Sequence, residues 1–564
     1  MALILSGKPR MGGYILGGSS SSNKGADKTE YSKGGHDYWL VKLDAKGKKV
    51  WDRTIGGNYS EGISTLEQTR DGGYILGGST ASGKGGDKSE ENKTSPDEEI
   101  PNRYDYWLVK LDANGNKVWD KTYGGNSTDF LSSVQQTQDG GYILGGSSDS
   151  RISGDKTQDS KSGCKPGYGD YGAEINCPND YWIIKVDAKG QKQWDKTFGG
   201  LEDDNLKSIR QTPDGGYILA GSSNSGKNAD KSQVAYGKQD ACTSEDEAGN
   251  RYCGYHYDFW VIKIDILGNK IWDTTIGGDN DDELAALDLT PDGNYILGGT
   301  SSSNKSGNKS ANNKGYQDYW LVKLTAEGRV SWDNTFGGNW VEALHSLQAT
   351  NDGGYILGGN SSSDSGQDKS ENSKGTYQNQ DYWVVKVNAT GNKVWDKTIG
   401  GDDIDELNSI RQTQEGGYLL AGSSISNKGA DKSEARRGEE GVYDGWIVKL
   451  TENNKQGQTI TYTPIPDRTT TAGPFTLTAT VSSGLPLVYE LVSGPGKLQG
   501  ALVRPTGSGI IVIKVNQPGN ASYLPAQEVI LKINIIIYFY DPVIIIAPAR
   551  FAFIPTCTGF GKTS

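Results

Sequence analysis

Histidine, methionine and cysteine are scarce in this sequence, which has three, two and five of them among 564 residues. It also has no GxSxG, HExxH or phosphate-loop motif and no Cys–His nucleophilic pair. His36 and His256 occupy the same slot just before a predicted strand, so we interpret them as loop residues. The sequence therefore predicts a protein that is not an enzyme. A glycosidase that uses only two carboxylates stays open, because acids roughly 5–9 Å apart leave no sequence signature.

Long apolar runs and helical periodicity are missing as well. The C-terminal tail is apolar, but Asp541, Pro542, Pro548 and Arg550 interrupt it. Because a spanning helix needs about 20 predominantly apolar residues, we predict no transmembrane segment. The N-terminus has no usable signal peptide and starts almost in the middle of a repeat. We therefore expect a fragment, in which the missing signal says little about location.

Positive charge is not concentrated anywhere in the chain. The formal net charge is -12 and the lysines are scattered, so a polyanion would be repelled and nucleic acid is not an expected partner. Apolar residues make up only 34%, whereas glycine reaches 79, tyrosine 30 and tryptophan 14. This composition favours short strands and turns with aromatic side chains in the core.

The aromatic residues reveal an internal repeat. Three series recur: a Tyr in "GGY", a Trp in "DYW" and a Trp in "WD". Their members are Tyr14, Tyr74, Tyr142, Tyr217, Tyr295, Tyr355 and Tyr418; Trp39, Trp107, Trp182, Trp260, Trp320, Trp383 and Trp446; and Trp51, Trp119, Trp194, Trp272, Trp332 and Trp395. Each DYW Trp stands 35 residues before the next GGY Tyr, whereas the distance from that Tyr to its own Trp varies from 25 to 43. All length variation thus falls in one loop per repeat.

Each repeat reads as four strands, typified by "FLSSVQQT", "YILGGSS", "DYWLVKLD" and "KVWDKTYGG". In the third strand, Trp107 and Val109 share one face and Tyr106 and Leu108 the other. Apolar residues on both faces suit a sheet packed between two others. We predict an all-β fold, a seven-bladed β-propeller of four-stranded blades with incomplete terminal blades, in which residues 2–6 supply a missing strand. Eight blades in a longer parent is the alternative.

The segment "TYGGNSTDFLSSVQQTQDGGYILGGSS" with "DYWLVKLDANG" resembles the extracellular bacterial β-propeller repeat of the SBBP type. It is still more similar to the Gly-Tyr-Ile-Leu-Gly-Gly repeat proteins of surface-living Bacteroidetes. The resemblance covers about residues 11–450 and implies a propeller and an exported protein, with no known activity. Such proteins often end in a type IX secretion sorting domain, which this tail does not show.

The composition changes after Leu450. Residues 457–535 have Thr/Val/Ile strands with Pro/Gly turns and read as an Ig-like β-sandwich, which resembles the bacterial Ig-like modules that act as spacers or stalks. The predicted domains are a propeller over 1–452, this sandwich over 457–535, and an apolar tail of unknown structure over 536–564.

The cysteines indicate an oxidising compartment. Cys164 and Cys177 bracket one loop segment and Cys242 and Cys253 another, so we predict two local disulfides. Neither pair has CxxC spacing or a nearby His, which makes zinc the weaker interpretation. Cys557 is left over.

Loops on a rigid scaffold are where binding usually occurs. In a four-stranded meander the variable loops and the "GGNSTDF" connections lie on one face, and the three longest loops are residues 79–104, 147–179 and 222–257. We predict ligand-binding residues among their tyrosines and Trp340, the one tryptophan outside the repeat: Tyr104, Tyr168, Tyr171, Tyr236, Tyr252, Tyr255 and Trp340. Aromatic rings among polar residues suit sugar rings or a protein partner. Neutral loop growth and inter-subunit contacts are the alternatives.

Acidic residues also recur at fixed positions of the repeat. An acid stands near each Gly-Gly, at Glu61, Asp129, Asp204, Asp282, Glu342 and Asp405. We interpret these as acceptors for turn amides. Calcium is the alternative, with Asp203, Asp204, Asp281 and Asp282 as its candidates, and no other cofactor is expected. The Asp of each WD pair is predicted to be structural.

The sequence therefore predicts a secreted or cell-surface, non-catalytic adhesion module that recognises extracellular glycan or protein through the long-loop face. The alternatives are a display scaffold without a specific ligand and, third, a carbohydrate-active hydrolase.

Overall fold

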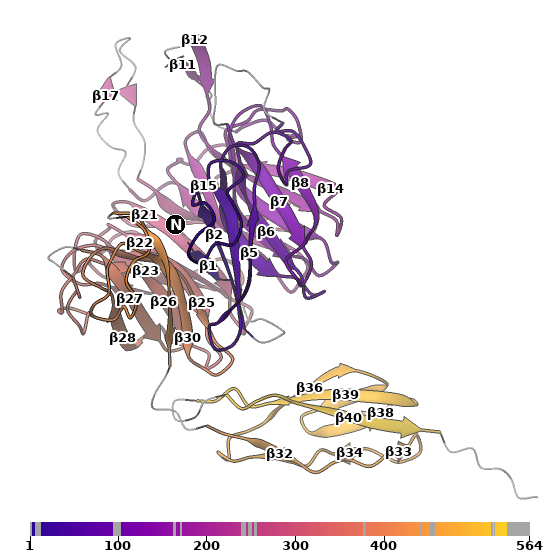
Figure 1. Ribbon diagram of the computed structural model, residues 1–564. Helices are drawn as coiled ribbons and strands as arrows, with labels where there is room; N and C mark the ends of the chain where they lie inside the picture. Colours follow the sequence, from indigo (N-terminus) through magenta and orange to yellow (C-terminus); the bar gives the residue numbers. More distant parts are fainter. Residues whose placement is uncertain are drawn as a thin grey trace, which may run out of the picture. The chain divides into compact units, whose positions relative to one another are not determined.

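The computed structural model describes residues 3–5, 13–93, 103–161, 165–169, 172–237, 244–245, 251–252, 256–375, 379–439, 441–451, 457–520, 523 and 525–537. The chain divides into two compact units, Met1–Lys455 and Gln456–Ser564. The regular elements of the described residues are all β-strands (Figure 1). In this part of the chain no helix is long and apolar enough to cross a membrane.

The repeats of the first unit form seven antiparallel sheets among the described residues, numbered here in chain order. Sheet 1 is β1 (Leu3–Leu5), β2 (Tyr14–Ser20), β3 (Asp37–Leu43) and β4 (Lys49–Ile55); sheet 2 is β5 (Glu61–Gln68), β6 (Tyr74–Thr80), β7 (Asp105–Leu111) and β8 (Lys117–Tyr123); sheet 3 is β9 (Asp129–Gln136), β10 (Tyr142–Ser148), β13 (Asp180–Val186) and β14 (Lys192–Phe198); sheet 4 is β15 (Asp204–Gln211), β16 (Tyr217–Ser223), β19 (Asp258–Ile264) and β20 (Lys270–Ile276); sheet 5 is β21 (Asp282–Leu289), β22 (Tyr295–Ser301), β23 (Asp318–Leu324) and β24 (Val330–Phe336); sheet 6 is β25 (Glu342–Ala349), β26 (Tyr355–Ser361), β27 (Asp381–Val387) and β28 (Lys393–Ile399); sheet 7 is β29 (Asp405–Gln412), β30 (Tyr418–Ser424) and β31 (Asp444–Leu450).

Two of the long loops carry small hairpins of their own. These are β11 (Lys165–Gly169) with β12 (Gly172–Asn176), and β17 (Ser244–Glu245) with β18 (Arg251–Tyr252).

The order of strands within each sheet follows the chain, as the four-strand pattern predicts. The second strand lies between the first and third; in sheet 3, for example, Leu144 of β10 pairs with Val134 on one side and Ile184 on the other. The hairpin turns close with backbone hydrogen bonds such as that from the N–H of Gly140 to the carbonyl of Thr137 (2.9 Å). Both faces of the third strand are buried in the middle sheets, because another sheet packs on each side.

Each sheet packs against the next through one apolar cluster. Six clusters join sheets 1 to 7 in order. A seventh, smaller cluster joins Leu419 and Ala421 of sheet 7 to Leu16, Val41 and Leu43 of sheet 1, so the sheets close into a ring. Successive first strands contact one another, which places them at the centre of the ring and the fourth strands at its rim. The arrangement is a propeller-like all-β repeat fold.

An aromatic ring from each third strand packs on the next sheet. Tyr106 of sheet 2 lies 4.9 Å from Trp182 of sheet 3, centroid to centroid, and its hydroxyl donates to the carbonyl of Trp182 at 3.1 Å. The same ring contact recurs at every junction from sheet 1 to sheet 7: Tyr38–Trp107, Tyr106–Trp182, Tyr181–Trp260, Phe259–Trp320, Tyr319–Trp383 and Tyr382–Trp446. The "DYW" motif therefore recurs because each copy in sheets 2 to 6 supplies both halves of an inter-sheet contact.

The terminal sheets differ from the others. The prediction that residues 2–6 supply a missing strand is confirmed: β1 pairs with β2, with Leu3 opposite Gly18. Sheet 7, in contrast, has three strands among the described residues, and β31 pairs with β30 alone.

The second unit has its own apolar core. Its sheets are β32 (Ile460–Tyr462) with β35 (Ala479–Val481); β33 (Arg468–Thr469), β40 (Val529–Ile536), β39 (Gly509–Asn516) and β36 (Val488–Ser493); and β34 (Phe475–Thr476), β38 (Leu502–Pro505) and β37 (Gly496–Gln499). Along β39, Ile511, Ile513 and Val515 are buried, and the residues between them are less so. One apolar cluster includes residues of all three sheets, as expected for sheets packed face to face.

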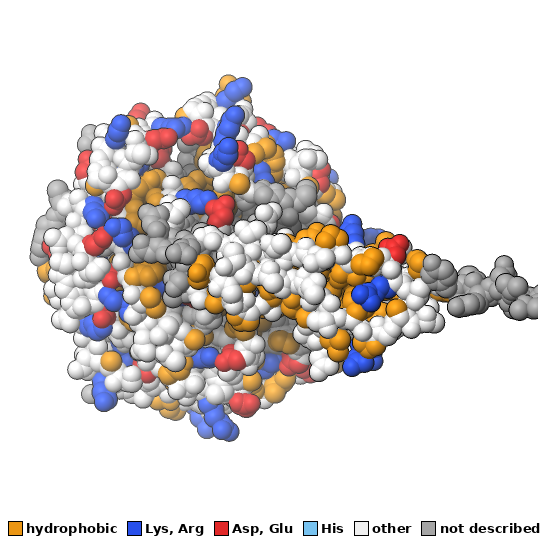
Figure 2. Space-filling model, turned by 90° about the horizontal axis from the view of Figure 1, so that it is seen from below, with side chains coloured by type: hydrophobic (Ala, Val, Ile, Leu, Met, Phe, Trp, Pro, Cys, Tyr) orange, Lys and Arg blue, Asp and Glu red, His pale blue; other side chains and the backbone are white. Residues whose placement is uncertain are grey.

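Figure 2 shows charged side chains of both signs interspersed with hydrophobic ones over the face in view. No single-sign patch dominates that view, in keeping with the scattered lysines of the sequence.

Candidate functional site

The variable loops and the Gly-Gly connections lie together on one face of the first unit, which we call the loop face. The N–H of Asp129, which follows a Gly-Gly connection at the start of β9, donates to the carbonyl of Tyr104 at the end of a variable loop (2.6 Å). At the next position along the ring, the N–H of Asp204 donates in the same way to Asn179 (2.7 Å). The shared face predicted from the meander is therefore present.

The acid near each Gly-Gly accepts the N–H of the second glycine. Asp129 Oδ2 accepts from Gly125 at 2.7 Å and from the hydroxyl of Ser150 at 3.1 Å. The same bond to the glycine N–H is made by Glu61, Asp204, Asp282, Glu342 and Asp405. Burial raises the pKa of Asp129 to about 6. The turn-amide interpretation is confirmed at all six positions.

The four calcium candidates are engaged with backbone amides. Besides Asp204 and Asp282, Asp203 accepts the N–H of Asn179 (2.9 Å) and Asp281 that of Tyr257 (2.9 Å). Within the described ranges, no group of three or more His, Cys, Asp or Glu side chains is placed to hold a metal ion. Calcium binding stays a prediction.

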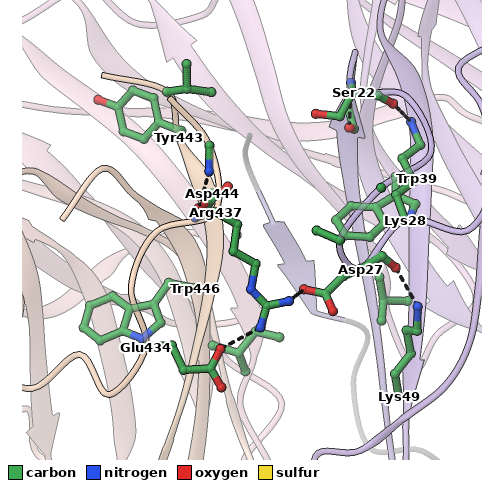
Figure 3. Close-up of a pocket in the computed structure, with 18 of the residues that line it drawn as sticks. Ser22, Asp27, Lys28, Trp39, Lys49, Glu434, Arg437, Tyr443, Asp444 and Trp446 are labelled. Carbon is green, nitrogen blue, oxygen red and sulfur yellow. Dashed lines mark hydrogen bonds and ion pairs between the residues drawn. The ribbon is translucent and has the colours of Figure 1, made fainter. Parts of the chain in front are cut away.

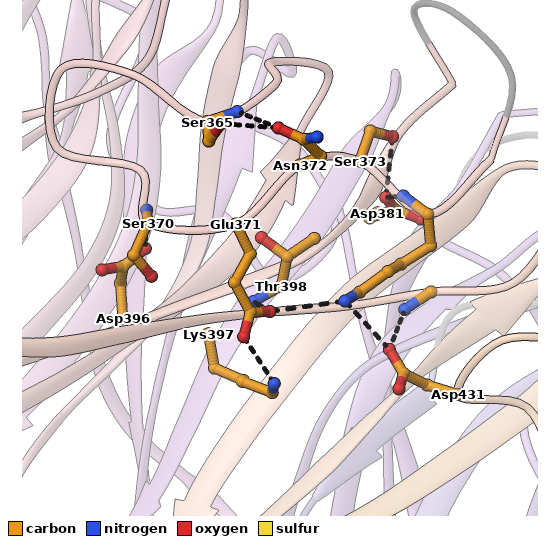
Figure 4. A network of polar contacts seen from close by, with 12 residues as sticks. Ser365, Ser370, Glu371, Asn372, Ser373, Asp381, Asp396, Lys397, Thr398 and Asp431 are labelled. Atoms are coloured by element: carbon orange, nitrogen blue, oxygen red, sulfur yellow. Dashed lines mark hydrogen bonds and ion pairs between the residues drawn. The ribbon is translucent and has the colours of Figure 1, made fainter.

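A polar network connects the variable loop of sheet 6 to sheet 7 (Figure 4). Lys374 lies 4.0 Å from Asp431 and 3.4 Å from Glu371, and Glu371 also binds Lys397 at 2.6 Å. Asp431 in turn accepts the N–H of Gly400 (3.3 Å). Equivalent cation–Asp pairs occupy most junctions: Lys33–Asp87, Lys93–Asp155, Lys161–Asp230, Lys314–Asp368, Lys374–Asp431 and Arg437–Asp27.

The junction between sheets 4 and 5 lacks this ion pair. Tyr236 stands where the other repeats have Lys or Arg, since its N–H binds Asp258 (2.7 Å) as that of Lys314 binds Asp318. Asn308 stands where the others have Asp. The ring of Tyr236 instead lies against Gly307, where an added Cβ would come within 2.8 Å of it. The predicted ligand-binding residue Tyr236 thus has a packing role at this junction.

Two further predicted residues lie in aromatic pairs on the loop face. Trp340 stacks on Tyr316, with ring centroids 5.5 Å apart and planes at 22°. Tyr104 packs on Phe130 at 5.4 Å and 31°. Tyr316 and Phe130 were missed by sequence reasoning because neither belongs to a recurring motif, and the other repeats have no Tyr, Phe or Trp at either position.

The remaining predicted residues are described in part or not at all. Tyr168 lies in β11 and Tyr252 in β18, where only the backbone is described, and Tyr171 and Tyr255 fall outside the described residues. Tyr104, Tyr236 and Trp340 lie at three different junctions of the ring. Cys177 is buried and disulfide-bonded. Its predicted partner Cys164, like Cys242, Cys253 and Cys557, lies outside the described residues, so both pairings stay predictions.

A cavity of about 690 Å³ lies where sheet 7 meets sheet 1, a junction that we call the seam (Figure 3). Trp39 lines one side and Trp446 the other. Arg437 spans the cavity from Glu434 (2.7 Å) to Asp27. Hydrogen bonds from Arg437 to Glu434 and the charge of Asp27 raise the pKa of Arg437. The cavity was not predicted, although the sequence signal is plain: Trp446 is the one DYW tryptophan that no WD pair follows.

Three lysine side chains also line the seam. The ammonium of Lys28 donates to the backbone carbonyl of Ser22 (2.7 Å), and that of Lys49 donates to the backbone carbonyl of Asp27 (2.6 Å). The ammonium of Lys432 lies 5.9 Å from the ring centroid of Trp446. Burial lowers the pKa of both Lys28 and Lys432.

Carboxylates near the ring centre are engaged as well. Glu67 of β5 accepts the N–H of Gln136 on β9 (2.8 Å), and Asp288 of β21 accepts that of Ala349 on β25 (3.1 Å). Burial raises the pKa of Glu67. Both side chains therefore tie neighbouring first strands together.

No protein-family model and no curated protein sequence matches this chain. Solved structures resemble it distantly. A hydrazine synthase of Kuenenia stuttgartiensis is 10% identical, with a TM-score of 0.37 over 74% of this chain and 91% of that one. A puromycin hydrolase is 9% identical, with a TM-score of 0.40 over 93% and 60%. A glucose dehydrogenase is 9% identical, with a TM-score of 0.32 over 70% and 97%. Similarity at this level transfers no activity, and the resemblance to SBBP-type repeats stays a prediction.

Proposed function

We propose that this chain is a secreted or cell-surface binding module, built on a seven-bladed β-propeller with an Ig-like spacer, that recognises extracellular glycan through its loop face. A disulfide at Cys177 supports an oxidising compartment. The ring of seven sheets among the described residues and the apolar cluster that joins sheets 7 and 1 support the blade count.

The observation that carries the binding proposal is the stacked pair of Tyr316 and Trp340. The side chain of Tyr316 is 66% exposed. Its backbone N–H donates to the carbonyl of Trp340 (2.7 Å), and the N–H of Trp340 donates to the hydroxyl of Ser363 (2.8 Å). These bonds fix both backbones, so little conformational entropy is lost when a ligand covers the rings.

Flat aromatic faces among polar groups suit the apolar face of a sugar ring. Asn339, beside Trp340, is exposed, and its amide supplies donors and an acceptor for sugar hydroxyls. Tyr59 occupies the position of Trp340 in an earlier repeat and is 63% exposed. Two such positions on the loop face offer two sites to a repetitive polymer, and linked weak sites raise avidity.

The test is binding of the purified protein to arrays of glycans and of matrix proteins. We expect glycan binding that falls at least about tenfold in the Tyr316→Ala/Trp340→Ala variant, which is the loss expected when a stacking contact of about 1.4 kcal/mol is removed. The control is Ile266→Ala/Leu267→Ala, which removes two side chains with exposures of 58% and 64% at a turn on the opposite face. Equal loss in both variants would contradict a site at Tyr316 and Trp340, and no binding by the parent would support the display scaffold instead. Binding to a matrix protein alone would favour the protein-recognition alternative.

A further inference from the structure

Sheet 7 is the one sheet whose fourth strand is missing from the described residues. Six fourth strands, β4, β8, β14, β20, β24 and β28, share the pattern "x-x-W-D-x-T" followed by an apolar residue and Gly-Gly. Each pairs with the third strand of its own sheet. The corresponding edge of β31 is unpaired among the described residues. Its residues are half-buried or exposed, whereas those of β27 are all buried.

Filled junctions show what a fourth strand contacts. In sheet 2, Asp120 of β8 accepts the indole N–H of Trp107 (3.1 Å) and the N–H of Ser89 (2.9 Å). Two residues later, the N–H of Thr122 donates to Glu90 (3.0 Å). The third strand and the variable loop thus present one indole donor, one amide donor and one carboxylate acceptor to the incoming strand.

The fourth strand also contacts the next sheet. Trp51 of β4 covers the turn of sheet 2 at Gly115, where an added Cβ would lie 2.9 Å from the indole. The Gly-Gly that follows β4 exchanges bonds with Asp87, whose N–H donates to the carbonyl of Gly56 (2.8 Å) and whose carboxylate accepts the N–H of Gly56 (3.1 Å).

The seam presents the same groups without the strand. Trp446, Ser433 and Glu434 correspond to Trp107, Ser89 and Glu90, and all three line the cavity. The indole N–H of Trp446 and the N–H of Ser433 meet no acceptor among the described residues. Glu434 is held by Arg437 in place of a strand amide.

On the sheet 1 side of the seam, the groups that would contact a fourth strand also lack those contacts among the described residues. Gly47 corresponds to Gly115, but a Cβ built on it meets nothing within 4 Å. Asp27 corresponds to Asp87, and its carboxylate pairs with Arg437, with no glycine N–H on it. Every contact point of a fourth strand is therefore in place on both walls.

We propose that the seam is a strand-acceptor site, which binds an extended segment of the repeat's own fourth-strand type, K-V-W-D-K-T-I-G-G, from another polypeptide. The segment pairs with the open edge of β31. Its Trp covers Gly47, its Asp accepts from Trp446 and Ser433, and its Gly-Gly meets Asp27. Addition of a strand to an open edge gains main-chain hydrogen bonds, and side-chain pockets supply specificity. The other six junctions identify the expected ligand, because at each of them a fourth strand of this sequence type makes the same contacts within the chain.

The test uses the full chain and a labelled peptide with the sequence of residues 393–401, measured by fluorescence anisotropy. We expect saturable binding, weakened about tenfold when the peptide Asp is replaced by Asn, since a hydrogen bond to a charged group contributes about 1.5–3 kcal/mol. Replacement of the peptide Trp by Ala weakens binding at least as much. These two arms change nothing in the protein and so do not depend on the folding of a variant.

A protein variant completes a double-mutant cycle. Trp446→Phe lowers affinity for the parent peptide about tenfold and leaves affinity for the Asp→Asn peptide nearly unchanged, because the removed donor and acceptor are partners. Trp320→Phe, the same change in a filled junction, leaves both affinities unchanged. Equal binding of all peptides, no binding, or additive losses in the cycle would overturn the proposal. The proposal would also be overturned if the chain formed a dimer that a saturating concentration of the peptide did not dissociate.

Discussion

The indole N–H of Trp107 donates to Oδ2 of Asp120 across two neighbouring strands, at 3.1 Å. The same oxygen accepts the N–H of Ser89 from the variable loop (2.9 Å), and Oδ1 binds Lys117 (2.7 Å). Burial alone would raise the pKa of Asp120, but these hydrogen bonds outweigh it and lower the pKa. One carboxylate thus holds a loop and two strands of a sheet together, and the prediction that the WD pair is structural is confirmed.

This bond makes a matched pair of substitutions informative. We expect Trp107→Phe to lower the free energy of unfolding by about 2–4 kcal/mol, because it leaves a small cavity and removes a donor to a buried charge. Trp446→Phe makes the same chemical change where the described residues offer the indole no acceptor, and we expect less than half that loss. Urea unfolding followed by near-ultraviolet circular dichroism compares the two. Equal losses would show that the indole bond contributes little.

The fold was predictable because the same pattern of strands and turns recurs in successive repeats. Fixed spacing between Trp39 and Tyr74, and at five more places, defined the strands, and apolar residues on both faces of residues 105–111 indicated stacked sheets. Residues 2–6 could be predicted as a strand because the number of first strands was one short, and the structure has that strand at Leu3–Leu5.

The candidate site was less predictable because it depends on departures from the repeat. Trp340 was found as the tryptophan that fits no series, but Tyr316 comes from a loop, and only backbone pairing brings it onto Trp340. Tyr236 was counted among loop aromatics, whereas the structure places it in the slot of an ion-pairing lysine. The cavity at the seam follows from a missing strand, whose consequences for Gly47 and Trp446 require three dimensions.

Exchange of Tyr236 and Asn308 for the residues of other junctions tests the packing role of Tyr236. We expect Tyr236→Lys and Asn308→Asp to destabilise singly, since each leaves a charge without its partner. The double variant should lose about 0.5–1 kcal/mol less free energy of unfolding than the sum of the two single losses. This is the coupling energy typical of a partly exposed ion pair. Thermal unfolding of the four proteins of the cycle measures this coupling. An additive result would mean that the two positions do not contact as Lys314 and Asp368 do.

Buried carboxylates at the junctions give stability a specific dependence on pH. Burial, with the charge of nearby Asp129, raises the pKa of Asp105 to about 8, and burial raises that of Asp129 to about 6. The folded state then binds more protons than the unfolded state above pH 4, so the stabilisation is present at low pH and is lost as pH rises through about 6 to 8. We expect a higher melting temperature at pH 5 than at pH 8.

Two variants test the origin of that slope. Asp105→Asn keeps a neutral side chain at every pH and should flatten the decline between pH 5 and 8. Asp112→Asn, in an exposed turn of the same sheet, is the control: hydrogen bonds from Asn116 lower the pKa of Asp112, so it is ionised throughout this range. An unchanged slope in Asp105→Asn would place the titration elsewhere.

Backbone hydrogen exchange should identify β31 as the least protected third strand of the ring. It pairs with β30 alone, so about half of its N–H groups face the open edge, whereas those of β27 face β26 and β28. Local opening is also easier where the apolar cluster is small, and the cluster at the seam has five buried residues against eight or more at the other junctions. By mass spectrometry we expect a peptide spanning 444–450 to exchange at least about tenfold faster than one spanning 381–387, the effect of about 1.4 kcal/mol in local opening. Addition of the fourth-strand peptide should slow the first and leave the second unchanged. Equal rates in the two strands without peptide would mean that the edge of β31 is already covered.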